Sequence, residues 1–193
     1  MKIKEFNGGL EEGNQEITIG IDQSLTGFAL SAVSVEFPNK HMTWVYKSEF
    51  RGVQRLVDIY NWLDGKLTEF MWNGWKVKDA AMEGTVLASH SALALGELAA
   101  VVKLVLWYKL AEPPLQIPPM TLKKYASGKG TSKKQEMLLQ IYKRWGVEFN
   151  DDNAADAYAL ARLASGSAID AIEREIQEKI KDDKYRDFIE QTL

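Results

Sequence analysis

The chain has 193 residues, of which 46% are hydrophobic and 26% are charged, which is typical of one soluble globular domain with a proper core. It has no cysteine and only two histidines, so a disulfide framework, a thiolate metal site and a histidine-rich zinc centre are excluded. A net charge of −3 gives the chain as a whole no electrostatic attraction to nucleic acid.

Residues 1–16 lack the hydrophobic core of a signal peptide and read as a mobile or loosely attached leader. No apolar run reaches transmembrane length, because the longest apolar segment is interrupted by Glu97 and Lys103. We therefore expect an intracellular, cytoplasmic protein that is neither secreted nor attached to a membrane.

Three short β-rich runs follow the leader, separated by polar turns, and they predict an antiparallel meander. The next segments alternate between helical spacing and short apolar runs. The meander strands are 17–22, 27–35 and 42–50; helices are expected at 53–72 and 91–110, and further strands at 76–84 and 115–119. This order predicts an α/β fold with a mixed five-stranded sheet flanked by helices.

The second half is expected to be mainly helical, with helices near 120–126, 132–145 and 152–165. In the tail, isoleucines recur at helical intervals and predict an amphipathic helix that packs on the body or on a second subunit. The expected organisation is a leader over 1–16, a domain over 17–165 and a C-terminal helix over 166–193.

Three acids that are far apart in the sequence can meet in this arrangement. Asp22 ends the first strand of the meander, Glu83 ends the strand 76–84, and Asp156 lies on the helix 152–165, among alanines that permit close packing on the sheet. Clustered carboxylates favour a hard cation such as Mg²⁺ or Mn²⁺. Two such cations, about 3.5–4 Å apart, can stabilise the attacking and leaving oxygens when a phosphodiester is hydrolysed.

A fourth ligand is expected from the start of the same helix. Asp152 precedes Asp156 by four residues and Asn153 precedes it by three, and both spacings share a helix face. Asp152 adds a full negative charge and is the preferred helper, unless it caps the helix; Asn153 is the alternative, and Asp151 is expected to be a solvent-exposed bystander.

The segment 121–145 is strongly basic within an otherwise acidic chain. Such a stripe is typical of a face that meets phosphates, although a solvated helical face has the same composition. A lysine close to the scissile phosphate would stabilise transition-state charge. The candidate DNA contacts are Lys123, Lys124, Lys129, Lys133 and Lys134.

Four blocks of the sequence, in this order, resemble the RuvC-type Holliday junction resolvases of the ribonuclease H-like superfamily. The blocks are "ITIGIDQSLTGFAL", "AMEG" with "ASHSALALGELAAVV", "PPMTLKKYASGKGTSKKQ" and "DDNAADAYALA". The similarity runs from about Ile17 to Leu163 and is greatest to the phage-borne branch, so it implies a bacterial or phage-infected host cell.

By position, the resemblance makes Asp22, Glu83 and Asp156 the family's acids and Lys123 and Lys134 its two lysines. It implies nicking of four-way DNA junctions by a homodimer, with Mg²⁺ (or Mn²⁺) bound as two ions per active site and Lys134 acting in catalysis. The two-fold symmetry of a dimer suits the paired nicks that a junction requires.

This sequence departs from the family pattern at three positions. Gln23 replaces the usual proline, Val86 stands where many members carry an aromatic that wedges into the junction, and Asn153 stands where cellular members have aspartate or histidine. The second departure puts the wedge and the sequence preference in doubt, but not the chemistry.

Other functions remain open at this point. The "GIDQSLTG" turn also resembles the first phosphate loop of actin-like ATPases, but the chain is too short for their second domain. A non-catalytic junction-binding module would not need all three acids and both lysines. A nuclease of the same superfamily that acts on other branched DNA or on RNA is the main alternative.

Overall fold

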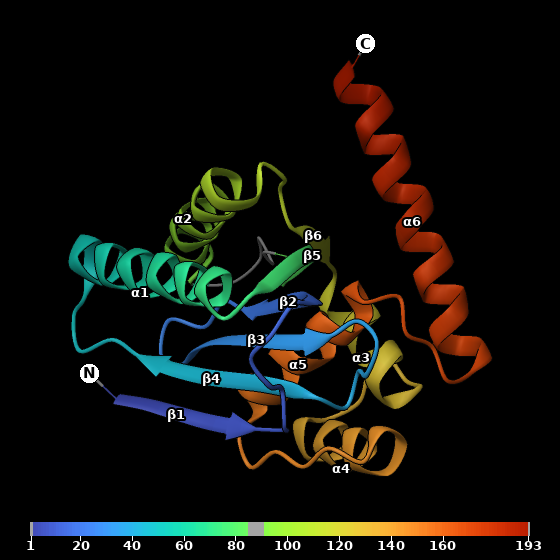
Figure 1. Ribbon diagram of the computed structural model, residues 1–193. Helices are drawn as coiled ribbons and strands as arrows, with labels where there is room; N and C mark the ends of the chain where they lie inside the picture. Colours follow the sequence, from blue (N-terminus) through green and yellow to red (C-terminus); the bar gives the residue numbers. More distant parts are fainter. Residues whose placement is uncertain (1, 85–90, 193) are drawn as a thin grey trace.

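The computed structural model describes residues 2–84 and 91–192, with side chains described through residue 182. Val86, the position of the missing aromatic, lies outside the described residues. Six strands form one mixed sheet in the order β1-β4-β3-β2-β5-β6 (Figure 1). The strands are β1 (Lys2–Asn7), β2 (Gln15–Asp22), β3 (Phe28–Ser34), β4 (His41–Lys47), β5 (Trp75–Glu83) and β6 (Leu115–Ile117).

The predicted meander is confirmed, because β3 pairs antiparallel with both β2 and β4. β5 pairs parallel with β2 on one side and with β6 on the other. The α/β class and the mixed sheet are therefore as expected, and the sheet's centre is β2, which carries Asp22 at its end.

The prediction of five strands was wrong, because the expected leader contributes a sixth. β1 pairs antiparallel with β4 along its whole length, from Lys2 opposite Lys47 to Asn7 opposite Met42. The segment showed no strand signal because β1 is an edge strand with mostly exposed side chains, so its residues have no alternation of buried and polar positions. Phe6 is its inward contact, packed edge-on to Phe149 with ring centroids 5.3 Å apart.

In the described chain six helices lie close to their predicted positions, and all but the last pack around the sheet. α1 and α2 lie on one face, while α5, supported by α3 and α4, lies on the other (Figure 1). The helices are α1 (Gly52–Trp72), α2 (Ala92–Leu110), α3 (Pro119–Ser127), α4 (Lys134–Trp145), α5 (Asp152–Ala164) and α6 (Ala171–Thr192).

The alternation along β2 shows how one strand serves two cores. Ile17, Ile19 and Ile21 point into the core under α1 and α2. On the opposite face α5 approaches the backbone itself, since a Cβ on Gly20 would lie 2.0 Å from the carbonyl oxygen of Ala157. This contact confirms that the small residues of α5 allow it to lie directly on the sheet.

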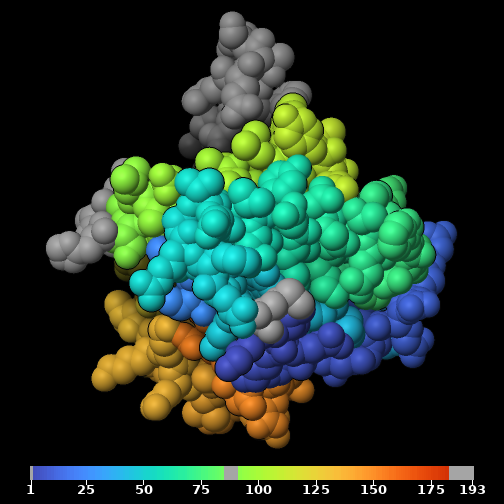
Figure 2. Space-filling model, turned by 90° about the vertical axis from the view of Figure 1, so that its left-hand side faces the viewer, coloured from blue at the N-terminus to red at the C-terminus, as the bar shows by residue number. Residues whose placement is uncertain are grey.

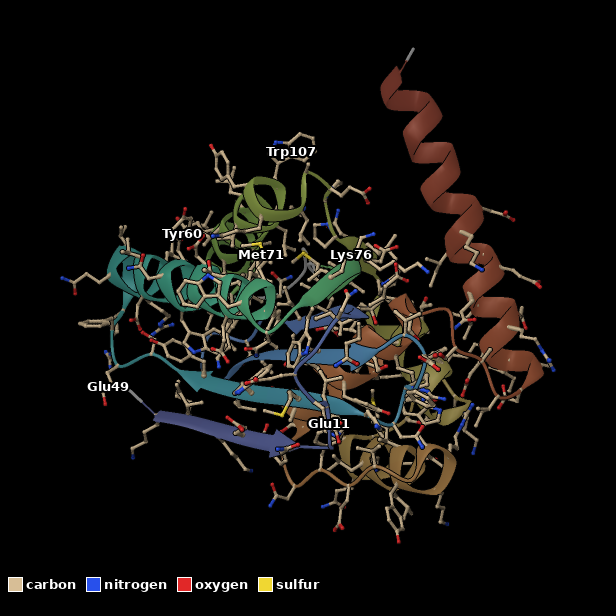
Figure 3. The ribbon with its side chains drawn as sticks, viewed as in Figure 1. Glu11, Glu49, Tyr60, Met71, Lys76 and Trp107 are labelled. Carbon is tan, nitrogen blue, oxygen red and sulfur yellow. The ribbon has the colours of Figure 1, made fainter. Side chains whose placement is uncertain are left out.

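The outer surface of α1 and α2 is unusually apolar. Figure 2 shows α1 lying across this face with the N-terminal residues along its lower edge, and Figure 3 shows Trp107 on the side of α2 that faces away from the sheet. Its large exposed apolar side chains include Val53, Val57, Trp72, Leu104, Trp107 and Tyr108. Within the described chain, no helix combines the length and the hydrophobicity needed to cross a lipid bilayer.

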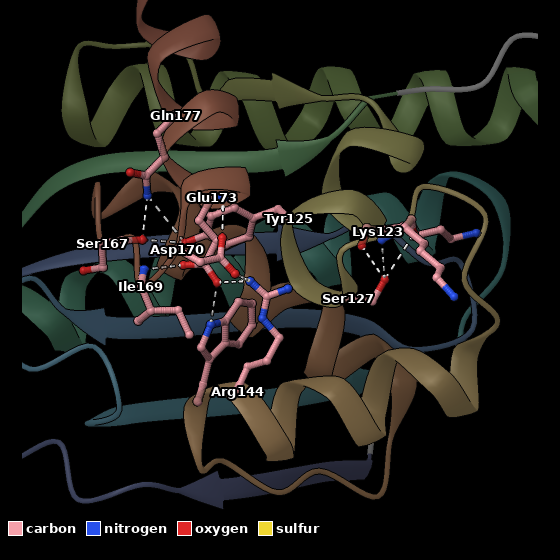
Figure 4. Close-up of polar contacts among 11 residues, drawn as sticks. Lys123, Tyr125, Ser127, Arg144, Ser167, Ile169, Asp170, Glu173 and Gln177 are labelled. Atoms are coloured by element: carbon pink, nitrogen blue, oxygen red, sulfur yellow. Dashed lines mark hydrogen bonds and ion pairs between the residues drawn. The ribbon is translucent and has the colours of Figure 1, made fainter.

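The start of α6 is attached to α4 by a polar cluster around the buried Glu173, which we call the α4–α6 cluster: Arg144, Trp145, Asp170 and Glu173 (Figure 4). Glu173 is fully buried and accepts hydrogen bonds from the Arg144 guanidinium (2.5 Å), the Trp145 indole N–H (3.0 Å) and the Ile169 backbone N–H (2.9 Å). Arg144 also donates to Asp170 at 2.7 Å. Every oxygen of the buried carboxylate therefore has a donor.

Candidate active site

A cavity of about 480 Å³ opens where the ends of β2 and β5 meet the first turn of α5 and the basic segment. It brings together side chains from six elements and the turn after β2. The lining residues are Asp22, Gln23, Ser24, Leu25, Thr26, Glu83, Ser91, Leu95, Lys123, Lys134, Met137, Leu138, Asp152, Asn153, Ala155 and Asp156.

Parallel pairing brings the two strand-end acids to one place. The ladder between β2 and β5 extends to Ile21 opposite Met82, so Asp22 and Glu83 each follow one residue later at the same edge of the sheet. Asp22 is only 7% exposed, and Glu83 is half-buried. The sequence prediction that these acids face a common point is supported by their shared cavity.

Asp156 joins them from α5, one turn into the helix. The residue that caps this helix is Asp151, whose Oδ1 accepts from the backbone N–H groups of Asn153 (3.1 Å) and Ala154 (3.4 Å). Asp151 is therefore a partly buried helix cap rather than a solvent-exposed residue, although it lies outside the cavity lining, and the alternative that Asp152 is the cap is excluded. Because Asp151 caps, both Asp152 and Asn153 sit in the first helical turn and face the cavity.

The clustered acids have strongly perturbed acidities. Burial raises the pKa of Asp22 well above its usual value, and the neighbouring charges of Asp156, Glu83 and Asp152 raise it further. Burial, with repulsion from Glu83 and Asp152, raises the pKa of Asp156 to about 7. Burial also raises the pKa of Glu83, against the opposing effect of Lys123 and Lys134.

Asp152 is an exception, because its carboxylate is paired with the Lys134 ammonium group. This hydrogen bond lowers the pKa of Asp152 and raises the pKa of Lys134. The basic segment thus contacts the acid cluster directly, which sequence spacing alone did not predict.

Asn153 packs against the turn between β2 and β3. A Cβ on Gly27 would lie 2.6 Å from the amide nitrogen of Asn153, so a larger residue at position 27 would displace this side chain. Asn153 and Asp152 therefore both reach the cavity, from adjacent positions but with different neighbours: Gly27 for the amide and Lys134 for the carboxylate.

The structure divides the five candidate DNA-contacting lysines. Lys123 and Lys134 line the cavity. Lys129 and Lys133 are exposed and outside its lining, in the loop before α4. Lys124 points elsewhere, with its ammonium 3.1 Å from Glu175 of α6.

The donor set suits a hard divalent cation. Four carboxylates and two lysine ammonium groups line the cavity, so its fully ionised side chains carry an excess of two negative charges. Burial and the repulsion between these acids raise the pKa values of Asp22 and Asp156, and a bound cation would offset both effects by stabilising the ionised carboxylates. In the described part of the chain, however, no three acidic or histidine side chains are already gathered as a metal cluster. The side chains would have to move together around an ion.

Gln23 is the cavity residue whose role was missed. It directly follows Asp22, is 6% exposed, and donates from Nε2 to the backbone carbonyl oxygen of Glu83 at 2.8 Å. Its departure from the family's proline was the one signal in the sequence, but the bond to Glu83 links residues 60 positions apart and could not be read from that signal.

No family model and no curated protein sequence matches the chain. Solved structures with a similar fold include Thermus thermophilus RuvC, with 19% identity and a TM-score of 0.62 over 86% of this chain and 96% of that chain. T. thermophilus RuvC in complex with a Holliday junction substrate gives 21% identity and a TM-score of 0.60 over 76% and 90%. The yeast mitochondrial Holliday junction resolvase Ydc2 has 16% identity and a TM-score of 0.53, over 95% of this chain and 86% of that chain. The chain therefore has the RuvC-type, ribonuclease H-like fold.

Proposed function

We propose that this protein is a structure-selective endodeoxyribonuclease that resolves four-way DNA junctions by paired, metal-dependent nicking. The observation that carries the proposal is the cavity in which Asp22, Glu83, Asp152 and Asp156 lie together with Lys123 and Lys134. The fold, which is shared with RuvC in complex with a Holliday junction substrate, supports four-way DNA as the substrate.

In this proposal, Asp22, Glu83 and Asp156, helped by Asp152 or Asn153, would hold two Mg²⁺ ions, and Mn²⁺ would substitute. The chemistry that such ions would supply, when bound by these residues, is activation of a water for attack and stabilisation of the charge on the leaving oxygen. Lys134 would leave Asp152 and donate from Nζ to an oxygen of the scissile phosphate, and Lys123, which also lines the cavity, would add a second positive charge.

The outer lysines would bind DNA rather than act in the reaction. Lys129 and Lys133 are exposed next to the cavity's basic wall, where they could follow a phosphate backbone. Lys124 fits this role less well, because its ammonium is held by Glu175. Lys133 forms the N-terminal boundary of α4, so a strand passing it would lie close to Lys134.

A homodimer would supply the two active sites that paired nicking requires. The exposed apolar surface of α1 and α2 supports an isologous interface, since Leu104, Trp107 and Tyr108 are each more than half exposed. Residues 17–165, now with β1 added to their sheet, would form the nuclease domain, and α6 would be an appendage anchored by the α4–α6 cluster.

The test is a cleavage assay with purified protein on four-way, three-way, flap and linear DNA and on branched RNA, each with Mg²⁺, Mn²⁺ or Ca²⁺. We expect symmetric nicks in the four-way junction with Mg²⁺ and Mn²⁺, and binding without cleavage with Ca²⁺. Equal or faster cutting of flaps, three-way DNA or RNA would replace the proposal with another nuclease specificity. Cleavage that persists in EDTA would contradict the metal-dependent chemistry.

A further inference from the structure

We infer that Gln23 is a positioning residue that holds the Glu83 carboxylate in register with Asp22, and so gives the site its affinity for Mg²⁺. The inference rests on the proposed function for the identity of the site, and it adds a residue to which the RuvC resemblance assigns no role. Its basis is the Nε2–carbonyl bond of 2.8 Å between Gln23 and Glu83.

The bond lies where the backbone connection between the two strands has ended. The parallel ladder joins β2 to β5 as far as Ile21 and Met82. After Asp22 the chain turns, with the Ser24 N–H bonded back to the Asp22 carbonyl oxygen at 3.1 Å. The side chain of Gln23 therefore adds one more hydrogen bond between β2 and β5 beyond the end of the backbone ladder, next to Asp22 and Glu83.

Glu83 is held from both sides by this arrangement. Its carbonyl oxygen accepts from Gln23, while the N–H of the next residue, Gly84, donates to the carbonyl oxygen of Ile117 at 2.8 Å. One bond ties the end of β5 to β2 and the other ties it to β6. With both in place, the backbone of Glu83 cannot drift from Asp22 without breaking a hydrogen bond of a buried side chain.

Such a tether matters more for Mg²⁺ than for a larger ion. Mg²⁺ demands near-ideal octahedral geometry, whereas Ca²⁺ accepts more ligands in flexible arrangements. Among the described residues no three acids are already placed to hold a metal ion, so the backbone positions of the cavity's acids decide how far each side chain must move to bind one. Loss of groups that support metal ligands typically reduces metal affinity about 10- to 100-fold.

The test uses Gln23→Met, which keeps the length of the side chain and removes its donor. Without DNA, we expect the Mg²⁺-induced rise in Tm to need about tenfold more Mg²⁺ than in the wild type, while the Ca²⁺-induced rise changes by less than about threefold. In junction cleavage, the Mg²⁺ concentration for half-maximal rate should rise by the same factor, with the rate at saturating Mg²⁺ nearly retained. Gln23→Asn, whose amide is one methylene too short to reach Glu83, should behave alike if Gln23→Met does not fold.

Thr18→Val is the matched control, because Thr18 lies on the same strand and also donates from a buried side chain to a distant backbone carbonyl. Its Oγ1 donates to the Ala161 oxygen at 2.8 Å, away from the cavity. We expect it to lower the Tm without altering the response to Mg²⁺. If Thr18→Val and Gln23→Met shift the Mg²⁺ response equally, or if neither does, Gln23 has only a structural role and the inference is overturned.

The two proposals fail in different ways. A wild-type protein that responds to Mg²⁺ by a rise in Tm but cuts none of the DNA substrates contradicts the proposed function alone, and the Tm comparison still decides the role of Gln23. A wild-type protein that cuts junctions, with a Gln23→Met variant of unchanged Mg²⁺ dependence, contradicts the inference alone.

Discussion

The cavity between β2 and α5 and the α4–α6 cluster both bury carboxylates, but they balance the charge differently. In the α4–α6 cluster, Glu173 is completely buried and receives hydrogen bonds from Arg144, Trp145 and Ile169. In the cavity, Asp22 and Asp156 are buried beside other acids, and burial, followed by the repulsion from those acids, raises their pKa values.

The difference shows in which cluster the protein's own side chains balance the buried negative charge. Removing a buried carboxylate that is surrounded by donors destabilises the fold, because the donors lose their partner, whereas carboxylates that repel one another cost stability until a cation joins them. The two clusters should therefore respond oppositely to mutation: neutralising Glu173 should destabilise the fold, whereas neutralising Asp22 or Asp156 should stabilise the metal-free protein.

The largest effect is expected from Asp22→Asn. As a proposed metal ligand, Asp22 should be needed for cleavage, so its loss should reduce junction cleavage in Mg²⁺ by about a thousandfold or more, since changes to groups behind metal ligands already cost about 10- to 100-fold. Glu83→Gln should act alike, and both variants should still bind junctions in a gel-shift assay. Wild-type cleavage rates for either variant would remove these residues from the catalytic site.

Glu173→Ala tests the completed cluster. It leaves the Arg144 guanidinium and the Trp145 indole N–H without their buried acceptor, so we expect the free energy of unfolding in urea to fall by about 3 kcal/mol. Glu175→Ala is the control on the same helix, because the exposed Glu175–Lys124 pair should contribute no more than about 1 kcal/mol. Equal losses in the two variants would show that burial of the α4–α6 cluster is not what anchors α6.

The pH dependence of the free energy of unfolding should show that the ionised Asp156 carboxylate destabilises the fold, in contrast to Glu173. Its pKa is about 7 in the folded protein and about 4 in an unfolded chain, so folding favours the protonated carboxyl. The loss of folding stability that ionisation of Asp156 causes is therefore absent below pH about 4. It grows as the pH rises and reaches about 4 kcal/mol above pH 7.

Replacing Asp156 by Asn removes this penalty. In EDTA, Asp156→Asn should be more stable than the wild type, by a margin that widens between pH 5 and pH 8 in urea titrations. Mg²⁺ at pH 8 should narrow the margin by stabilising the wild type only. A margin that does not change with pH would show that the carboxylate is not strained in the folded protein.

The choice between Asp152 and Asn153 gives a smaller effect. We retain Asp152 as the helper, so Asp152→Asn should raise the Mg²⁺ requirement for cleavage by about tenfold and Asn153→Ala should raise it less. Asp151→Ala serves as the control: it should cost about 1 kcal/mol of stability through loss of the helix cap, without changing the Mg²⁺ titration. If Asn153→Ala alone weakens cleavage, the amide is the fourth ligand.

The smallest effects are expected at the outer lysines. Lys129→Ala should weaken junction binding several-fold at low salt and reduce the slope of log affinity against log salt concentration by about one, with little change in cleavage rate at saturation. Lys124→Ala should alter binding less, because Lys124 is engaged with Glu175. Lys134→Ala should lower turnover more than binding; a purely binding defect there would exclude a catalytic role.

Local pattern and family resemblance were enough to place most of the fold and the main acids. The meander, the positions of the six helices and the strand ends at Asp22 and Glu83 follow from hydrophobic periodicity, which reflects contacts that repeat along each element. Parallel neighbours then bring the strand ends together, so the common location of these acids with Asp156 was also predictable.

What required the tertiary structure are features that depend on single long-range contacts. β1 becomes a strand only by pairing with β4, and Asp152 meets Lys134 only because α4 is folded against α5. The bond from Gln23 to Glu83 likewise joins residues 60 positions apart. Such contacts produce no repeating hydrophobic pattern in the sequence, because each is made only once. The polar side chains and strand edges that make them could also form hydrogen bonds with water.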